Sequence, residues 1–204
     1  MRQNNSSTAA DRSLKKIKEH GGVIRTAKAI QAGIHPRTLY RLRDEGDLEQ
    51  IARGVFRIPD SPSSMPDLIA VASRISNAVI CLDSALAFHQ LTTQIPRKVA
   101  IAIPKGAEKP RMDHPPIKVH WFSAPTHAAG VEEHPVDGVT VRVYGPEKTL
   151  ADCFKFRNKI GMDVVLEALK LYRLRMKFNG ADLVKYGRIC RVEKVMRPYL
   201  EAVM

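Results

Sequence analysis

Apolar positions in the first 25 residues follow a helical period and then give way to an extended pattern. Leu14 and Ile17 lie three residues apart in a Lys-rich segment, and Asp11 before them can cap a helix. A Gly-Gly pair at 21–22 predicts the end of this helix. The apolar pair at 23–24 predicts a short extended segment after it.

The segment 26–45, TAKAIQAGIHPRTLYRLRDE, predicts two short helices joined by a tight turn. Thr26 is a possible N-cap of the first helix, and Gly33 breaks it. Pro36 suits the first turn of the second helix, which ends by Gly46. A helix-turn-helix needs a small residue where its helices cross, a turn residue that tolerates positive φ, and inward apolar residues. The segment supplies these in register at Ala29, Ala32, Gly33, Ile34, Leu39 and Leu42.

The second of these helices has a polar face opposite its apolar one. With Leu39 and Leu42 directed inward, a rotation of about 100° per residue places other side chains outward. Arg37 and Arg41 lie one turn apart on this face, where they can reach guanine edges or phosphates. Alternatively, the arginines form a solvated face on which Asp44 pairs with Arg41. The outward residues are Arg37, Tyr40, Arg41 and Asp44.

The sequence LEQIARGVFRIP, at 48–59, predicts a β-hairpin that turns at Arg53-Gly54. A helix, a helix-turn-helix and a hairpin, in that order, make a winged helix-turn-helix, whose wing usually contacts the DNA backbone or minor groove. His35 and Thr38 flank the start of the second helix, where phosphates are commonly contacted. We therefore predict DNA contacts at His35, Arg37, Thr38, Tyr40, Arg41, Arg53 and Arg57.

The stretch DSPSSMP, at 60–66, is a Pro- and Ser-rich linker. It predicts a winged helix-turn-helix domain at 1–60 and a second domain at 67–204. The order of elements predicts an α+β fold, in which the second domain has a small sheet and a helical C-terminal end. Helices are expected at 68–75, 83–91, 146–157, 161–175, 179–189 and 192–203, and strands at 78–81, 98–104, 117–123 and in a hairpin at 131–144 around Asp137-Gly138.

Basic residues outnumber acidic ones by 33 to 21, a net charge of +12, and they are unevenly distributed. Residues 1–60 carry a net +5, residues 61–152 are neutral, and residues 153–204 carry a net +7. Two basic ends around a neutral middle favour a polyanionic partner, with nucleic acid as the first candidate. The alternative is that these charges only solvate the surface.

The C-terminal helices carry basic residues beside their apolar stripes. In 144–157, Leu150 and Phe154 form such a stripe, and Lys148 is expected on the basic outer face. A second phosphate-contacting surface and a solvated rim are equally compatible with this pattern. The candidate secondary phosphate contacts are Lys155, Arg157, Lys159, Arg173, Arg175, Lys177 and Arg188.

Cysteine usage and hydropathy indicate the compartment. The three cysteines are well separated and form no CxxC pair, which argues against a disulfide framework and fits a reducing cytoplasm. No apolar run approaches the ~18 residues that a membrane span needs. The N-terminal MRQNNSSTAADRS has no apolar segment and does not resemble a secretory signal. We therefore expect a cytoplasmic protein without a membrane partner.

The sequence favours no catalytic or metal site. The histidines at 114, 120, 127 and 134 are expected on separate strands and loops at the surface, so they predict no metal site. None of the acidic residues has a lysine two positions later, as a restriction-type nuclease core requires, and the chain lacks G-x-S-x-G, Walker A and GxGxxG motifs. Asp83 or Ser84 is expected to cap a helix, and His89 to form a hydrogen bond within the domain. We expect no enzymatic activity, no cofactor and no metal.

Three segments in order resemble the AbiEi-type antitoxins, transcriptional regulators of bacterial abortive-infection (type IV toxin–antitoxin) systems. These are the winged helix ending GVFRIP, the segment SALAFHQL, and VRVYGPEKTLADCFKFRNKIG. The resemblance covers residues from about 12 to 200. It implies a cytoplasmic repressor of its own operon that binds promoter inverted repeats, with a C-terminal domain that assists DNA binding and cooperativity.

The resemblance also implies a partner and a recognition face. The partner is a toxin that resembles a nucleotidyltransferase and is encoded by the neighbouring gene. The antitoxin counteracts this toxin without forming a stable complex with it. No catalytic residue carries over, whereas Arg37, Thr38, Tyr40 and Arg41 carry over as the face that meets DNA.

The sequence therefore favours a sequence-specific repressor that binds double-stranded promoter DNA and acts as an antitoxin. Two alternatives of other classes remain. The winged helix can direct a DNA-processing enzyme to its substrate, which metal-dependent cleavage of plasmid DNA would reveal. It can also dock onto a protein and neutralise that partner directly, which co-purification with a neighbouring gene's product would reveal.

Overall fold

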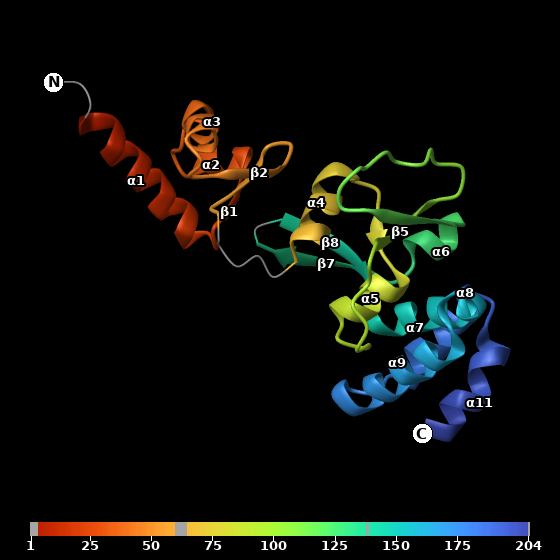
Figure 1. Cartoon of the computed structure of the whole chain (residues 1–204). Coiled ribbons are helices and arrows are strands. Elements are labelled where there is room, and N and C mark those ends of the chain that lie inside the picture. Colours follow the sequence, from red (N-terminus) through yellow and green to blue (C-terminus); the bar gives the residue numbers. More distant parts are fainter. Residues whose placement is uncertain (1–3, 60–64, 138, 204) are drawn as a thin grey trace. The chain divides into compact units, whose positions relative to one another are not determined.

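The computed structural model describes residues 4–59, 65–137 and 139–203. The chain divides into two compact units: an N-terminal unit of Met1–Ser76 and Pro135–Val141, and a C-terminal unit of Asn77–His134 and Arg142–Met204. The fold is α+β, as the sequence predicts, with a helical N-terminal region followed by a sheet and further helices (Figure 1). Most of the predicted linker, residues 60–64, lies outside the described residues.

Residues 4–59 of the N-terminal unit form a helix, a short strand, two further helices and a hairpin, which is the order expected for a winged helix-turn-helix. The predicted extended segment, both helices of the turn motif and the hairpin are all confirmed. The elements are α1 (Asn4–Glu19), β1 (Val23–Arg25), α2 (Thr26–Gln31), α3 (Pro36–Asp44), β2 (Glu49–Ala52) and β3 (Val55–Arg57).

The wing is an antiparallel sheet with the strand order β1-β3-β2. Phe56 of β3 is the partner of Ile24 on one side and of Gln50 on the other. Gly54 makes the hairpin turn at φ +70°, a conformation that L-residues with a side chain rarely adopt. The sequence predicts the hairpin but not the addition of β1, since that pairing joins residues about 30 positions apart.

The core of this unit confirms the apolar positions of the helix-turn-helix. Ala29, Leu39 and Leu42 are completely buried, and Gly33 takes the turn at φ +75°. Aliphatic residues of α1 and β1 and an aromatic residue of β3 complete the cluster, so the wing and the helices share one core. Its members are Ile17, Ile24, Ala29, Ile34, Leu39, Leu42, Leu48 and Phe56.

Two predicted helix caps in this region are wrong. Asp11 lies inside α1, because the polar residues from Asn4 onward are already helical. Thr26 does not cap α2: its N-cap is Arg25, which makes no side-chain capping bond. The Thr26 hydroxyl instead donates to the Gly54 carbonyl at 3.2 Å, a bond that ties the wing to the start of α2.

The N-terminal unit is completed by α4 (Pro66–Arg74), the helix predicted at 68–75, which contacts β2. Pro36 and Pro66 both stand in the first turn of their helices, where a proline lacks only a donor that would be unpaired anyway. Ile69 and Val71 of α4 are buried.

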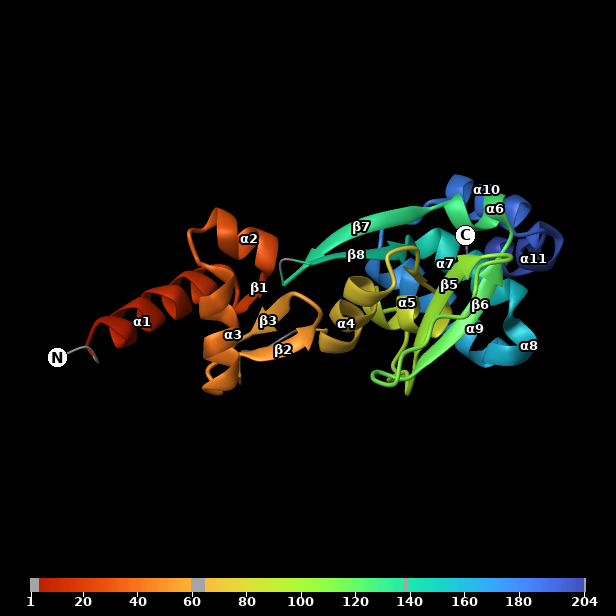
Figure 2. The same cartoon turned by 90° about the horizontal axis from the view of Figure 1, so that it is seen from above.

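The second sheet has the order β6-β5-β4-β8-β7; most of it belongs to the C-terminal unit, whereas the adjoining ends of β7 and β8 lie in the segment Pro135–Val141 of the N-terminal unit. Parallel β5 and β6 pair along their whole length, from Val99↔Ile117 to Pro104↔Phe122, whereas β4 is antiparallel to β5 and parallel to β8. Figure 2 shows β5 beside β6 and the long β7 and β8. The strands are β4 (Val79–Ile80), β5 (Val99–Pro104), β6 (Ile117–Phe122), β7 (Val131–Val136) and β8 (Val139–Tyr144).

The helices of the C-terminal unit pack largely around α7, which contacts α5, α9, α10 and α11. The sequence predicts all of them except the short α6 and α8. They are α5 (Leu82–Phe88), α6 (Ala124–Ala128), α7 (Pro146–Lys155), α8 (Arg157–Ile160), α9 (Met162–Arg175), α10 (Gly180–Ile189) and α11 (Glu193–Val203).

Because α7 is covered by other helices, the prediction that Lys148 lies on an outer face is wrong. Lys148 and Asp152, one turn apart on α7, are both completely buried and form an ion pair. The Lys148 ammonium lies 4.1 Å from the centroid of the Tyr144 ring, and the Cys190 thiol donates to Asp152 at 3.2 Å. Burial raises the pKa of the Asp152 carboxyl, and Lys148 opposes that shift.

The environments of the histidines and of Ser84 partly differ from expectation. The His89 Nε2–H donates to the Tyr144 carbonyl at 2.7 Å, which confirms its predicted internal hydrogen bond. His114 is exposed, but His120 is buried on β6, so the surface prediction is wrong for that residue. The predicted cap of α5 is also wrong: the N-cap, Cys81, makes no side-chain capping bond, and the Ser84 hydroxyl accepts from the Ala100 amide of β5 at 2.8 Å.

Candidate nucleic-acid interface

The candidate interface is built on α3, which the turn at Gly33 sets against α2. The Ile34 amide donates to the Ala29 carbonyl at 2.8 Å, closing the end of α2. His35 then caps α3 by accepting from the Arg37 amide on its Nδ1 at 3.2 Å. His35 therefore orients the helix as well as standing beside its first turn.

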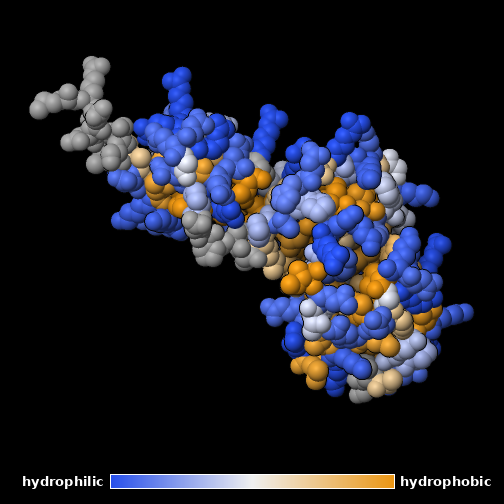
Figure 3. Space-filling model, viewed as in Figure 1, coloured by the Kyte–Doolittle hydropathy of each residue, from blue (hydrophilic) through white to orange (hydrophobic). Residues whose placement is uncertain are grey.

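The two sides of α3 differ in burial as the sequence predicts. Leu39 and Leu42 are completely buried, whereas Arg37 and Tyr40 are exposed. Figure 3 shows that the visible face of the N-terminal unit is largely hydrophilic, with some hydrophobic residues among the hydrophilic ones. An exposed polar helix face, followed by a hairpin wing, has the geometry of a recognition helix that enters a major groove.

Arg37 and Arg53 are the predicted contact arginines whose guanidinium groups are most available. Both are exposed, and in the described part of the chain neither guanidinium has a hydrogen bond or an ion pair. Arg37 lies in the first turn of α3 and Arg53 at the tip of the wing. These are the positions from which a recognition helix reaches base edges and a wing reaches the backbone.

The other two predicted arginines are held by carboxylates. Arg41 lies 3.9 Å from Glu45, one turn later on the same helix. Arg57 on β3 forms an ion pair with Glu49 on the neighbouring β2. Phosphate binding by these arginines must compete with the carboxylates, so their contribution is expected to be smaller than that of Arg37.

Arg43, which the sequence analysis did not select, joins the recognition helix to the wing. Its guanidinium donates to Asp44 at 2.7 Å and 2.9 Å and to Gln50 of β2 at 3.0 Å. It also lies 5.1 Å from the centroid of the Tyr40 ring. Tyr40 and Asp44 are close to Arg43 in the sequence, but Gln50 belongs to a different element. The contact of Arg43 with Gln50 could therefore not be predicted from the sequence.

Tyr40 rests its ring edge against Phe56, with 5.4 Å between the ring centroids. The residue is 41% exposed, so one part of it packs against the wing while the rest faces solvent. Tyr40 is thus a rigid amphipathic contact rather than a freely rotating one.

A hollow of about 260 Å³ lies at the N-terminal end of α3, between α1 and the turn. His35 and Thr38 line it, together with Arg12 and Lys16 of α1, which the sequence analysis did not select. The Lys16 ammonium donates to the Ala32 carbonyl at 2.6 Å, which fixes it at the turn. Basic side chains gathered at the start of a helix form a suitable environment for a DNA phosphate.

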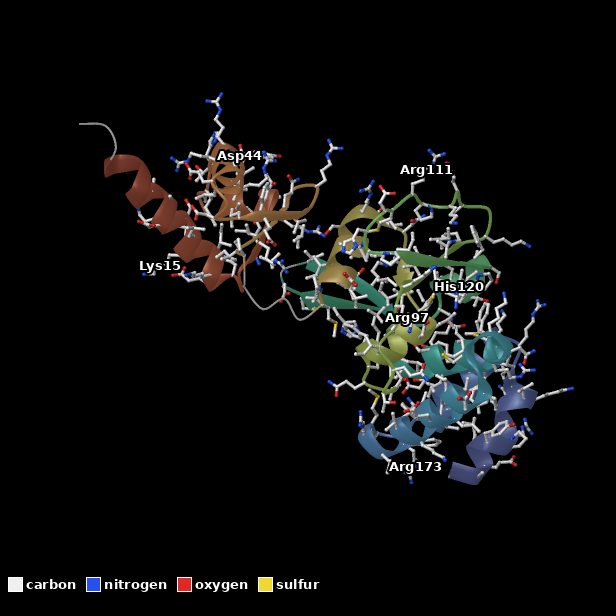
Figure 4. All side chains as sticks on the ribbon, viewed as in Figure 1. Lys15, Asp44, Arg97, Arg111, His120 and Arg173 are labelled. Carbon is white, nitrogen blue, oxygen red and sulfur yellow. The ribbon has the colours of Figure 1, made fainter. Side chains whose placement is uncertain are left out.

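The predicted secondary phosphate contacts of the C-terminal unit do not form one cluster. Lys155 and Lys159 lie before α9, and Arg173 in its last turn, so a helix of about 20 Å separates them. Figure 4 likewise places Arg173 away from His120 and Arg97. Arg157, Arg175 and Arg188 are held by hydrogen bonds to Phe154, Gln90 and Glu193, respectively, and Lys177 follows α9.

No group of three or more His, Cys, Asp or Glu residues among the described residues is arranged to hold a metal ion. Within the same residues, no helix combines the length and apolar character needed to cross a bilayer.

The fold joins a winged helix-turn-helix to an α+β unit. Residues 11–59 match the family model described as "Transcriptional regulator, AbiEi antitoxin", which confirms the resemblance for this part of the chain. No curated protein matches the sequence.

A solved structure shares the fold over both units. It is titled "Crystal structure of RV2827C protein from Mycobacterium tuberculosis" and superposes with a TM-score of 0.56. The alignment covers 88% of this chain and 71% of that one at 16% sequence identity. At that identity the likeness concerns the fold alone.

Proposed function

We propose that this protein is a sequence-specific DNA-binding repressor of the antitoxin type, without enzymatic activity. The proposal rests on one observation above all: an exposed Arg37 on the outer face of α3, whose guanidinium has no partner among the described residues, in a segment that matches a family of regulatory antitoxins. The net charge of +12 supports a polyanionic partner.

In this proposal α3 enters the major groove and the wing contacts the backbone. Arg37 reads a guanine edge, Tyr40 and Thr38 contact neighbouring positions, and Arg53 binds a phosphate of the adjoining groove. The hollow at the start of α3 receives a further phosphate between Lys16 and His35. Promoter inverted repeats are the proposed target, with one winged helix on each half.

The proposed partner in function is a nucleotidyltransferase-like toxin encoded next to this gene, in the cytoplasm. The family match of residues 11–59 supports an antitoxin role. We propose that repression and neutralisation proceed without a stable complex between the two proteins. Co-expression followed by affinity purification tests this point, and a stoichiometric complex would contradict it.

Arg37→Ala is expected to weaken promoter binding by about 1–3 kcal/mol and to reduce discrimination against mutated sites. The reason is that the variant removes a base-reading side chain with no other partner in the described residues. Fluorescence anisotropy with promoter DNA and with scrambled DNA of equal length measures both effects.

Lys15→Ala is the matched control, because it removes one positive charge from an exposed position outside the recognition helix. Lys15 lies on α1, and Figure 4 shows it away from Asp44, the last residue of α3. Titrations at two salt concentrations separate the possible roles of Arg37. A loss equal for both DNAs, together with a salt slope reduced by about 1, would reassign Arg37 to a phosphate. Unchanged affinity for both DNAs would refute the assignment of α3 as the reading helix.

A further inference from the structure

A hollow of about 300 Å³ lies within the C-terminal unit. Its walls come from α5, the segment 92–97, β6, and the adjoining ends of α8 and α9. This volume is at the lower end of the ~300–1,000 Å³ usual for small-molecule sites. The lining residues are Asp83, Leu86, Thr92, Gln94, Ile95, Pro96, Arg97, Lys118, Lys159, Ile160 and Val164.

The charge of the hollow is predominantly positive. Arg97, Lys118 and Lys159 line it, and in the described part of the chain none of these cations makes a hydrogen bond or an ion pair with a carboxylate. Asp83 is the acidic residue of the lining; burial raises the pKa of its carboxyl, and the charge of Lys118 opposes that shift. Three cations and one carboxylate around a concavity favour an anionic ligand.

His120 provides independent evidence that two of these cations act on one place. It lies two residues after Lys118 on β6, hence on the same face of the strand, and is only 8% exposed. Its Nε2 is buried without a hydrogen-bond partner among the described residues. Burial, followed by the charges of Lys118 and Lys159, lowers the pKa of His120 to about 4. An anion between the two lysines would relieve their repulsion of a proton on His120.

The wall formed by residues 92–97 is held in place by the rest of the unit. The Thr93 hydroxyl donates to Glu167 of α9 at 2.8 Å, and the Gln94 amide donates to the Thr92 hydroxyl at 3.1 Å. Arg175 donates to the Gln90 carbonyl at 2.7 Å just before this segment. The hollow is therefore largely formed before a ligand arrives, which lowers the entropic cost of binding.

The remaining lining suits the carbon part of a ligand. Leu86, Ile160 and Val164 supply apolar surface inside the hollow, and Ile95 at its edge is 91% exposed. An isoleucine this exposed would gain by packing against an organic body, whereas a hydrated phosphodiester backbone offers it little. The lining thus joins a cationic part to an apolar one.

We propose that this hollow binds a small organic phosphate, a phosphomonoester with a ring or carbon body about the size of a mononucleotide. Arg97, Lys118 and Lys159 bind the phosphate oxygens by charge-assisted hydrogen bonds, and Ile95 with the aliphatic wall covers the body. The site is that of an effector. Its lining residues belong to the C-terminal unit, whereas the proposed promoter contacts belong to the N-terminal unit, so it does not depend on the proposed repressor activity.

The test is an NMR titration of the full chain with AMP, with inorganic phosphate and with adenosine. We expect saturable shifts of the amides around Lys118, Lys159 and Ile95, with AMP binding tighter than phosphate and adenosine not binding. We also expect the pKa of His120 to rise from about 4 when AMP is bound. Absence of saturation, or equal binding of adenosine and AMP, would overturn the proposal.

A pair of charge-matched double variants completes the test. Lys118→Gln with Lys159→Gln should weaken AMP binding at least about tenfold, because two charge-assisted bonds are lost. Lys105→Gln with Lys109→Gln removes the same charge from exposed positions outside the hollow, and should leave AMP affinity within about twofold. An equal loss of AMP affinity in both double variants would mean that AMP is attracted only by the general positive charge, which would contradict a specific site. If only a DNA duplex shifts these amides, the surface is a backbone contact and the effector proposal is wrong.

Discussion

Asp152→Ala is expected to destabilise the C-terminal unit by about 3–5 kcal/mol, because it leaves a completely buried Lys148 ammonium without its carboxylate partner. Native domains are stable by only about 5–15 kcal/mol, so this loss approaches the whole stability of the unit. Lys148 has no route to solvent, and the Tyr144 ring at 4.1 Å is a weak substitute for a carboxylate.

Urea unfolding followed by tryptophan fluorescence measures this effect. The chain has one tryptophan, Trp121 on β6, so the signal reports the C-terminal unit. The unfolding midpoint of Asp152→Ala should fall strongly relative to the parent. An unchanged midpoint would mean that Lys148 finds another acceptor or loses its proton at little cost.

Two further variants separate the ion pair from simple loss of packing. Lys148→Met combined with Asp152→Leu replaces both charges by apolar groups, and such replacements are often neutral or stabilising by about 1–4 kcal/mol. The double variant should therefore recover most of the stability lost in Asp152→Ala. Lys185→Ala breaks an exposed pair with Asp182 on α10 and should change stability by less than about 1 kcal/mol.

The pair also shows where prediction from sequence reaches its limit. The helix-turn-helix was predictable because its signals are local: a small residue, a glycine turn, a proline in the first helical turn and a 3.6-residue apolar period. A lysine beside an apolar stripe has the same local appearance whether it is solvated or buried. Lys148 is buried because α5, α9, α10 and α11 pack around α7, and these contacts join segments that are distant in the sequence.

Other differences have the same origin. The pairing of β1 with β3 and the contact of Arg43 with Gln50 each depend on residues that the chain brings together from different elements. For the basic candidates Lys159 and Arg173, the sequence left a second phosphate-contacting surface and a solvated rim equally open; in the structure α9 separates the two residues. The hollow beside Lys118 was not predictable, since its walls come from five separate elements or segments.

Phe56→Ala is expected to destabilise the winged helix-turn-helix by about 3–5 kcal/mol. Phe56 is completely buried, pairs with both outer strands of the wing and supports Tyr40 of the recognition helix. Residues 11–59 form a small element with a limited core, so a loss of this size is large relative to its stability. Amide hydrogen exchange should show reduced protection in β1, β3 and α3, with little change in β5 and β6.

Phe56→Leu is the conservative control, because it keeps an apolar side chain in the core and leaves a smaller cavity. Comparison with Arg37→Ala then separates fold from recognition. Unfolding of the winged helix should lower the affinity for promoter and scrambled DNA by the same factor, set by the fraction of folded protein. Loss of a base-reading arginine should affect the promoter more than the scrambled DNA. If Phe56→Ala lost exchange protection yet bound the promoter normally, DNA binding would have to reside outside the winged helix, and the proposed function would need another surface.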